Sequence, residues 1–144
     1  MNDYYHTGNV YGYSVPQRIE LWKNSVFLIK KQPFFGVGTG DVKDAFKQEL
    51  QLNNSSLCEK GMRSHNQYFT FSIAFGIVGL LLILFSIFYP PFVLKKFRNP
   101  LFLVFFCIII FSMLSEDSLE PQDGVTFFAF FYSLVLFLEP TNCE

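Results

Sequence analysis

Long apolar runs fill the second half of the chain, and charged residues stand only between and after them. The stretch from Gln67 to Tyr89 holds 23 residues without a charge. A helix of that length, rising about 1.5 Å per residue, exceeds the roughly 30 Å hydrocarbon layer of a bilayer. Two further runs, of 16 and 15 residues, need flanking residues to complete a crossing. The pattern predicts three membrane-spanning helices, at about residues 67–89, 100–115 and 122–138.

The shorter runs have a second interpretation, as core helices of a soluble protein, because about 10–14 apolar residues often mean no more than that. A polar segment of 66 residues is too small, however, to cover three helices that are apolar on every side. We therefore expect an all-α fold, a fragment of a polytopic membrane helical bundle. Residues 67–144 would carry the spans, and residues 1–66 would form an amphipathic-helical extracytoplasmic loop.

A first amphipathic helix is predicted over about residues 16–32. Ser14 with Gln17 three positions later is typical of a helix start, with Ser14 as the cap. Apolar residues then recur at spacings of three and four, which predicts one apolar face. They are Ile19, Trp22, Val26 and Ile29, with Leu21, Phe27 and Leu28 widening the stripe. Such a helix could pack on the rest of the protein or lie in the membrane interface, where Trp is common.

A glycine-rich segment, Gly36-Val-Gly38-Thr-Gly40, separates that helix from a second one predicted over about residues 41–52. Asp41 or Thr39 would cap the second helix. Glycines can let backbone N–H groups approach a phosphate at a helix N-terminus. This segment lacks the Lys-Ser/Thr of a Walker loop and follows a helix, whereas phosphate loops follow a strand. A plain turn is the favoured interpretation.

The loops between the spans carry opposite charges. The first contains Lys95, Lys96 and Arg98, and the second contains only acids, at Glu116, Asp117, Glu120 and Asp123. The positive-inside rule places the basic loop in the cytoplasm, and hence residues 1–66 and the acidic loop on the periplasmic side of a bacterial inner membrane. Lys60 and Arg63 flank the first span as well, two cations against three, and weaken the rule.

Export of residues 1–66 needs an explanation, because residues 1–30 show no secretory signal pattern. Long charged N-terminal tails are also poor passengers for a following span. We therefore expect this chain to be the C-terminal part of a longer multi-span protein, with Met1 a shifted or artificial start.

Composition excludes some classes of function. A net charge of −1 gives no basic face for nucleic acid. Cys58, Cys107 and Cys143 fall at three different depths of the predicted topology, so we expect free thiols and no disulfide. Nothing in the spacing of ligand-type residues suggests a metal site, and no cofactor is expected.

A polar cluster, Arg63-Ser64-His65-Asn66-Gln67, stands where the polar half meets the first span. Histidine can accept a proton near neutral pH, and arginine can grip a phosphate at the headgroup level. An interfacial anchor is the plainer interpretation of the same residues. The acidic loop likewise has two interpretations, as paired carboxylates that orient a substrate or as a solvated connection.

Several of these segments together resemble the C-terminal part of the bacterial O-antigen ligase and O-antigen polymerase family. The similarity lies in their order and spacing over roughly residues 14–138. The segments are Arg18-Ile-Glu-Leu-Trp22, Pro33-Phe-Phe-Gly-Val-Gly-Thr-Gly-Asp41, His65-Asn-Gln-Tyr68, Gly76-Ile-Val-Gly79 and the acidic stretch Ser115 to Gly124.

The resemblance implies a metal-independent membrane glycosyltransferase that moves a glycan from undecaprenyl diphosphate to a hydroxyl of lipid A core or of a growing polysaccharide. It implies His65 as the base and Arg18 as a catalytic cation, with Arg63, Asn66 and Glu116 binding the diphosphate or substrate, or orienting His65. The earlier spans of that family are missing here, so we expect this chain to be inactive alone. The competing hypothesis is a small non-enzymatic membrane protein whose outer domain binds a partner.

Overall fold

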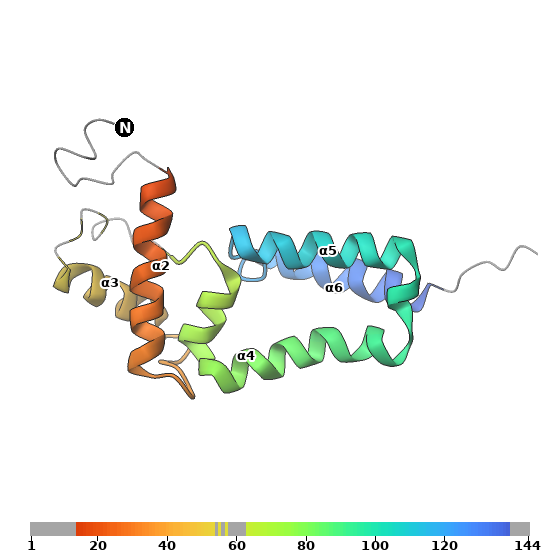
Figure 1. Ribbon diagram of the computed structural model, residues 1–144, viewed down its shortest axis with the longest axis horizontal. Helices are drawn as coiled ribbons and strands as arrows, with labels where there is room; N and C mark the ends of the chain where they lie inside the picture. Colours follow the sequence, from red (N-terminus) through yellow and green to blue (C-terminus); the bar gives the residue numbers. More distant parts are fainter. Residues whose placement is uncertain (1–13, 54, 56, 58–62, 139–144) are drawn as a thin grey trace, which may run out of the picture.

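The computed structural model describes residues 14–53, 55, 57 and 63–138, and in this part of the chain the secondary structure is entirely helical. Five α-helices and one short 3₁₀ helix follow one another (Figure 1). They are α2 (Ser14–Lys31), α3 (Val42–Leu52), α4 (Gln67–Val93), η2 (Lys96–Arg98), α5 (Pro100–Ser115) and α6 (Gln122–Phe137). The all-α prediction is therefore confirmed for these residues.

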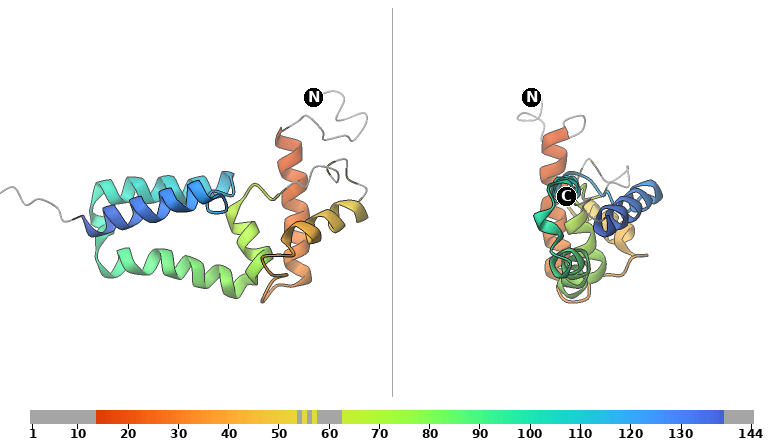
Figure 2. Two further views of the ribbon diagram at one scale, coloured as in Figure 1. Left: turned by 180° about the vertical axis from the view of Figure 1, so that it is seen from behind. Right: turned by 90° about the vertical axis from the view of Figure 1, so that its right-hand side faces the viewer.

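The second half of α4 lies side by side with α5 and α6, and the three form an elongated bundle (Figures 1 and 2). A cluster of buried apolar side chains joins them, with Phe102 at its centre and fully buried. The Tyr132 hydroxyl donates to the Ile87 carbonyl oxygen at 2.7 Å, which ties α6 to α4. In lipid, close packing and such hydrogen bonds hold helices together, because exclusion of water does not act there.

Only α4, at 27 residues, is long and apolar enough by itself to cross a membrane among the described helices. It continues four residues beyond the predicted end at Tyr89, through Pro90 and Pro91, which occupy its last turn. The outer faces of the bundle are apolar and exposed, as at Leu81, Phe85 and Phe111. Such faces suit lipid or further helices better than water.

A sharp kink at Gly76 corrects the expectation of one straight first span. Gly76 has φ +67° and ψ −171°, so the helical hydrogen bonds break there. The carbonyls of Ile73 and Ala74 accept instead from the N–H groups of Val37 and Gly38, at 2.8 and 2.9 Å. In return, the N–H groups of Ile77 and Val78 donate to the carbonyls of Pro33 and Phe34, at 2.8 and 3.3 Å.

This exchange satisfies backbone groups that a kink would otherwise leave unpaired in an apolar setting, where each one is costly. We call the two interlocked segments, residues 33–38 and 73–78, the glycine clasp. The approach is so close that a Cβ atom on Gly36 would lie 2.4 Å from the Ile73 oxygen, and one on Gly76 would lie 2.2 Å from the Phe34 backbone. Only glycine fits at either position.

Helices α2 and α3 lie at the end of the bundle where α4 begins, with α2 running across the bundle axis (Figures 1 and 2). Leu21 and Leu28 of α2 pack with Phe46 and Leu50 of α3 and with Ile73 of α4. The apolar stripe predicted for α2 is divided between the inner and outer sides of the helix. The residues that face inward are Leu21, Asn24, Ser25 and Leu28, whereas Ile19, Trp22 and Val26 of the predicted stripe are exposed.

Polar contacts accompany the packing of Leu21 and Leu28 on the inner side of α2. The Asn53 side chain donates to the Asn24 Oδ1 atom at 2.8 Å, and Lys31 pairs with the buried Glu49 at 2.7 Å. These partners lie on α3 and just after it, and periodicity of apolar residues alone carries no signal for them. Asp41 stands at the predicted cap position of α3 but makes no side-chain capping bond.

Candidate functional site

The acidic loop between α5 and α6 (Glu116–Pro121) folds back over the start of α4. Thr70 donates through its hydroxyl to Asp117 at 2.7 Å, and the Leu119 N–H donates to the Gln67 side-chain oxygen at 2.7 Å. Ser64 lies 2.6 Å from the Thr70 hydroxyl. All of these polar groups except those of the loop itself are buried. Hydrogen bonds to α4 therefore hold the loop in place, and it is not a freely solvated connection.

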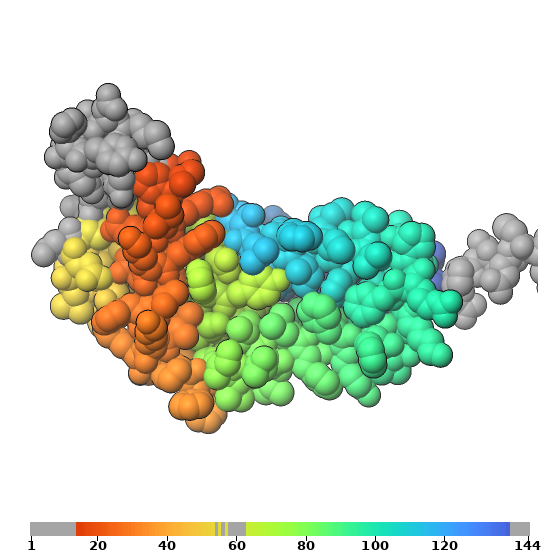
Figure 3. Space-filling view, in the orientation of Figure 1, coloured from red at the N-terminus to blue at the C-terminus, as the bar shows by residue number. Residues whose placement is uncertain are grey.

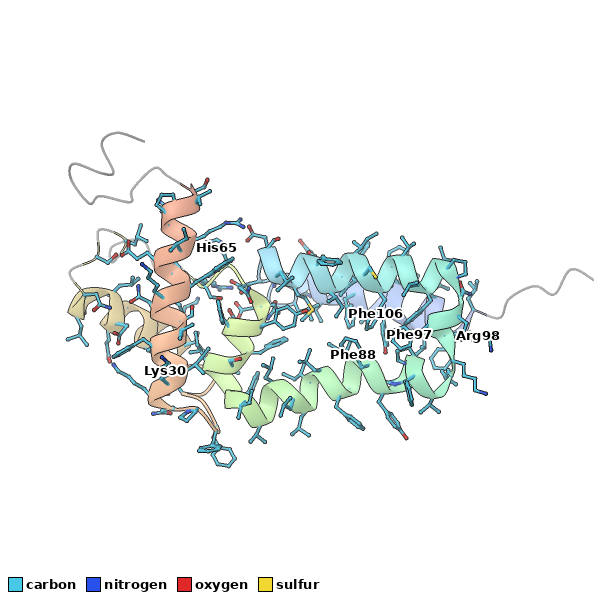
Figure 4. The ribbon with its side chains drawn as sticks, in the orientation of Figure 1. Lys30, His65, Phe88, Phe97, Arg98 and Phe106 are labelled. Atoms are coloured by element: carbon cyan, nitrogen blue, oxygen red, sulfur yellow. The ribbon has the colours of Figure 1, made fainter. Side chains whose placement is uncertain are left out.

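Glu116 lies between two of the predicted site residues. Its Oε1 atom accepts from Arg18 Nη2 at 2.6 Å, and its Oε2 atom lies 3.0 Å from His65 Nδ1. The three side chains come from α2, the acidic loop and the segment before α4, and Figure 4 shows His65 between α2 and the near end of the bundle. All three are partly exposed. A carboxylate on Nδ1 favours the tautomer with the proton there, which leaves Nε2 free to accept one.

Arg63 and Asn66 flank His65 with different partners. Arg63 pairs with Glu120 of the acidic loop and keeps 44% of its side chain exposed. Asn66 is buried, accepts from the N–H groups of Tyr68 and Phe69 as the cap of α4, and donates to the Leu114 carbonyl at 3.0 Å. Both ends of the Asn66 amide are thus in use within the protein. These contacts favour a positioning role for Asn66 over substrate binding.

The backbone of His65 is in the left-handed region, with φ +49°. That conformation costs a residue other than glycine about 1–2 kcal/mol. Strain of this kind persists where the surroundings hold a residue in place, and it concentrates at functional sites. The buried groups on either side, Ser64 and Asn66, provide that hold.

Replacing His65 with glycine is expected to leave the protein at least as stable as the parent. Glycine relieves the strain of about 1–2 kcal/mol. About 0.5–1 kcal/mol of this gain in stability is lost again, because glycine gives the unfolded chain more backbone freedom. Thermal unfolding in detergent measures the difference. His65→Val, which is β-branched, should unfold at a lower temperature than His65→Gly. The opposite order would contradict the left-handed backbone at this residue.

A cavity of about 390 Å³ lies beside the segment that carries His65. Lys43, Arg63 and Thr39 line it, together with Glu120, the carboxylate that pairs with Arg63. Its other walls include the aromatic rings of Phe46, Phe71 and Phe75. Cations and apolar rings in one cavity suit an amphiphile with an anionic head group.

The glycine segment is not available as a phosphate loop. Two of its N–H groups, those of Val37 and Gly38, already donate to α4 within the glycine clasp. Gly36 and Gly38 have φ values of +68° and +93°, as expected for a tight turn. The turn interpretation therefore accounts for this segment.

Cysteine and metal chemistry add little to the site. Cys107 is an exposed free thiol on α5, while Cys58 and Cys143 lie outside the described residues. Within the described ranges, no group of three His, Cys, Asp or Glu side chains is placed to hold a metal ion.

The five sequence-predicted site residues lie at one end of the bundle, around His65 and the acidic loop, opposite the basic turn that contains Arg98 (Figure 4). Sequence reasoning included Ser64 and Gln67 in the polar cluster without giving them a role, and it overlooked Thr70, although all three hold the acidic loop over His65. Their signal in the sequence was weak, because small polar residues at the start of a span also serve as an interfacial anchor.

Residues 10–84, slightly more than half of the chain, match the family described as O-antigen ligase. A protein of Haemophilus influenzae, described as uncharacterized, is 29% identical over 104 residues. That alignment covers 70% of this chain and 26% of the relative. The chain thus spans about a quarter of the length of the curated relative that it matches.

Proposed function

Because the chain belongs to the O-antigen ligase family, we propose that it carries the acceptor-activating part of a membrane glycosyltransferase. The donor in this proposal is a glycan on undecaprenyl diphosphate, and the acceptor is a hydroxyl of lipid A core or of a growing polysaccharide. The observation that carries the proposal is the Arg18–Glu116–His65 arrangement, in which one carboxylate bridges a cation and an imidazole.

His65 acts as general base in this scheme. The acceptor oxygen attacks the anomeric carbon of the glycan, and its proton passes to His65 Nε2. The bond between that carbon and the diphosphate oxygen breaks, and the electron pair leaves with the diphosphate. Glu116 stabilises the imidazolium that forms, because its carboxylate accepts a hydrogen bond from Nδ1–H.

Cations stabilise the leaving diphosphate. Arg18 uses one N–H group on Glu116 and has further donors on a side chain that is 39% exposed. Lys43 lines the neighbouring cavity, where negative charge would develop against a partly apolar wall, and so does Arg63, which also pairs with Glu120. Fixed cations in such a setting stabilise a growing charge more than they would in water.

The proposed placement is a bacterial inner membrane, with the basic turn on the cytoplasmic side and residues 1–66 on the periplasmic side. Length alone supports one crossing, by α4. Packing supports the other two, because α5 and α6 lie along the straight part of α4 and expose apolar faces of similar length. Family membership favours this proposal over a small partner-binding membrane protein.

Glu116→Gln and Arg18→Ala are each expected to lower glycan transfer by about 10²-fold, because a base that is misplaced by about 1 Å loses that much. Transfer is measured in a strain without its own ligase, from the lipopolysaccharide banding pattern, with the full protein carrying each substitution. Glu116→Asp and Arg18→Lys should recover part of the activity.

Two matched controls separate this effect from a general loss of charge. Asp123→Asn removes an exposed carboxylate near the same loop, and Arg98→Ala removes an exposed arginine at the far end of the bundle (Figure 4). Both should transfer glycan like the parent. Parental activity in Glu116→Gln and Arg18→Ala would remove the carboxylate bridge from the mechanism.

A further inference from the structure

The side of α2 that the fold leaves uncovered carries an apolar stripe. Val15, Ile19, Trp22 and Val26 recur at spacings of four, three and four, so they form one stripe on the helix. Their side chains are 64%, 47%, 36% and 39% exposed. The inward side carries Asn24 and Ser25 beside Leu21 and Leu28. An apolar stripe of this length on a polar segment needs a partner.

The position of α2 indicates which partner. It runs across the bundle axis at the end where α4 begins (Figures 1 and 2), so it lies parallel to the surface of any membrane that the bundle crosses. Trp22, at the edge of the stripe, contacts Phe69 with ring centroids 6.1 Å apart. The stripe therefore borders the bundle, while Asn24 and Lys31 face α3 on the other side. Figure 3 shows the side chains of α2 meeting those of the first turns of α4 and the end of α5.

The glycine clasp fixes the depth of two further apolar side chains. Phe34 and Phe35 are 64% and 80% exposed. The Phe34 carbonyl accepts from the Val78 N–H, so the backbone of this tip lies beside the first residues of the straight apolar part of α4. Aromatic side chains at the end of a span are typical of the boundary between water and lipid.

The exposed charged residues of α2 are mostly cationic and flank the apolar stripe. Lys23 follows Ile19 by four positions and Lys30 follows Val26 by four, so both flank the stripe, and both are exposed. The single acid of α2, Glu20, accepts from Ser55 on the side of α3. Cations in this position are attracted to an anionic membrane surface.

We propose that α2 and the Phe34–Phe35 tip form a membrane-surface anchor, with the α2 stripe and both rings inserted among the headgroups of a bilayer that contains anionic lipid. The anchor holds the loop helices, and with them Arg18, at a constant height above the spans. The inference rests on the membrane placement of the chain and not on the transfer reaction.

Trp22 is the single tryptophan of the chain, so its fluorescence reports on the anchor directly. The full chain is reconstituted into phosphatidylethanolamine and phosphatidylglycerol vesicles whose acyl chains carry bromine at chosen depths. We expect quenching to be strongest for bromines about 5–10 Å below the headgroups, where interfacial helices lie. Acrylamide in the buffer should quench weakly.

Ile19→Asp with Val26→Asp should abolish the quenching by brominated lipid and raise the quenching by acrylamide, whereas Lys47→Asp on the exposed side of α3 should change neither. Strong acrylamide quenching in the parent would place the stripe in water and overturn the anchor. Shielding of Trp22 from both quenchers would show a protein partner on the stripe and overturn it as well. Quenching of Trp22 fluorescence does not depend on enzymatic activity. The result would therefore be the same if the proposed glycan transfer proved wrong.

Discussion

His65→Ala is expected to lower glycan transfer by about 10²–10⁴-fold, the usual contribution of a general base. The imidazole is the one group of the cluster that can both accept a proton from the acceptor hydroxyl and be held by Glu116 at 3.0 Å. The measurement is the lipopolysaccharide pattern of a ligase-deficient strain that produces the full protein with this substitution. Lys47→Ala, on an exposed face of α3, is a suitable control and should transfer glycan like the parent.

Chemical rescue sharpens this experiment. His65→Gly removes the ring, relieves the left-handed backbone and leaves room for a small molecule, so added imidazole should restore part of the transfer. A protein that had lost activity through misfolding would not respond. Parental transfer in His65→Ala would exclude His65 as the base, whatever the behaviour of the other variants.

Gly76→Ala is expected to destabilise the protein by about 4–5 kcal/mol, at the upper end of single substitutions. The new Cβ atom would lie 2.2 Å from the carbonyl of Phe34, and the residue would keep a φ of +67°. Opening of the glycine clasp would then leave four backbone donors and their acceptors without partners. Thermal unfolding in detergent and protease sensitivity of the loop helices both report this loss.

A double-mutant cycle tests whether the clasp acts as one unit. Gly36→Ala should cost about as much as Gly76→Ala, since its Cβ atom would lie 2.4 Å from the Ile73 oxygen. The combined variant should lose much less than the sum, because the second substitution acts on a clasp that is already open. Gly40→Ala meets nothing within 4 Å and should leave stability nearly unchanged. Additive losses at positions 36 and 76 would contradict the proposed interlock.

Much of the candidate site was open to prediction, although its connections were not. Arg18, His65 and Glu116 were selected through the resemblance to the O-antigen ligase family, with which the chemistry of their side chains is consistent. The carboxylate bridge could not be derived, since Arg18 and Glu116 are 98 positions apart. The role of Asn66 could not be derived from the sequence either, because an asparagine can bind a substrate or cap a helix. In the structure its side chain caps α4.

The sequence by itself determined where the helices lie, because spacing of apolar residues, caps and glycine or proline breaks are local signals. It also determined that α4 is long and apolar enough to cross a membrane. The tertiary structure alone decided the kink at Gly76, the outward turn of the α2 stripe and the closure of the acidic loop over His65. Each depends on hydrogen bonds between segments distant in sequence, such as Val37 with Ile73, and periodicity within one helix carries no record of such a partner.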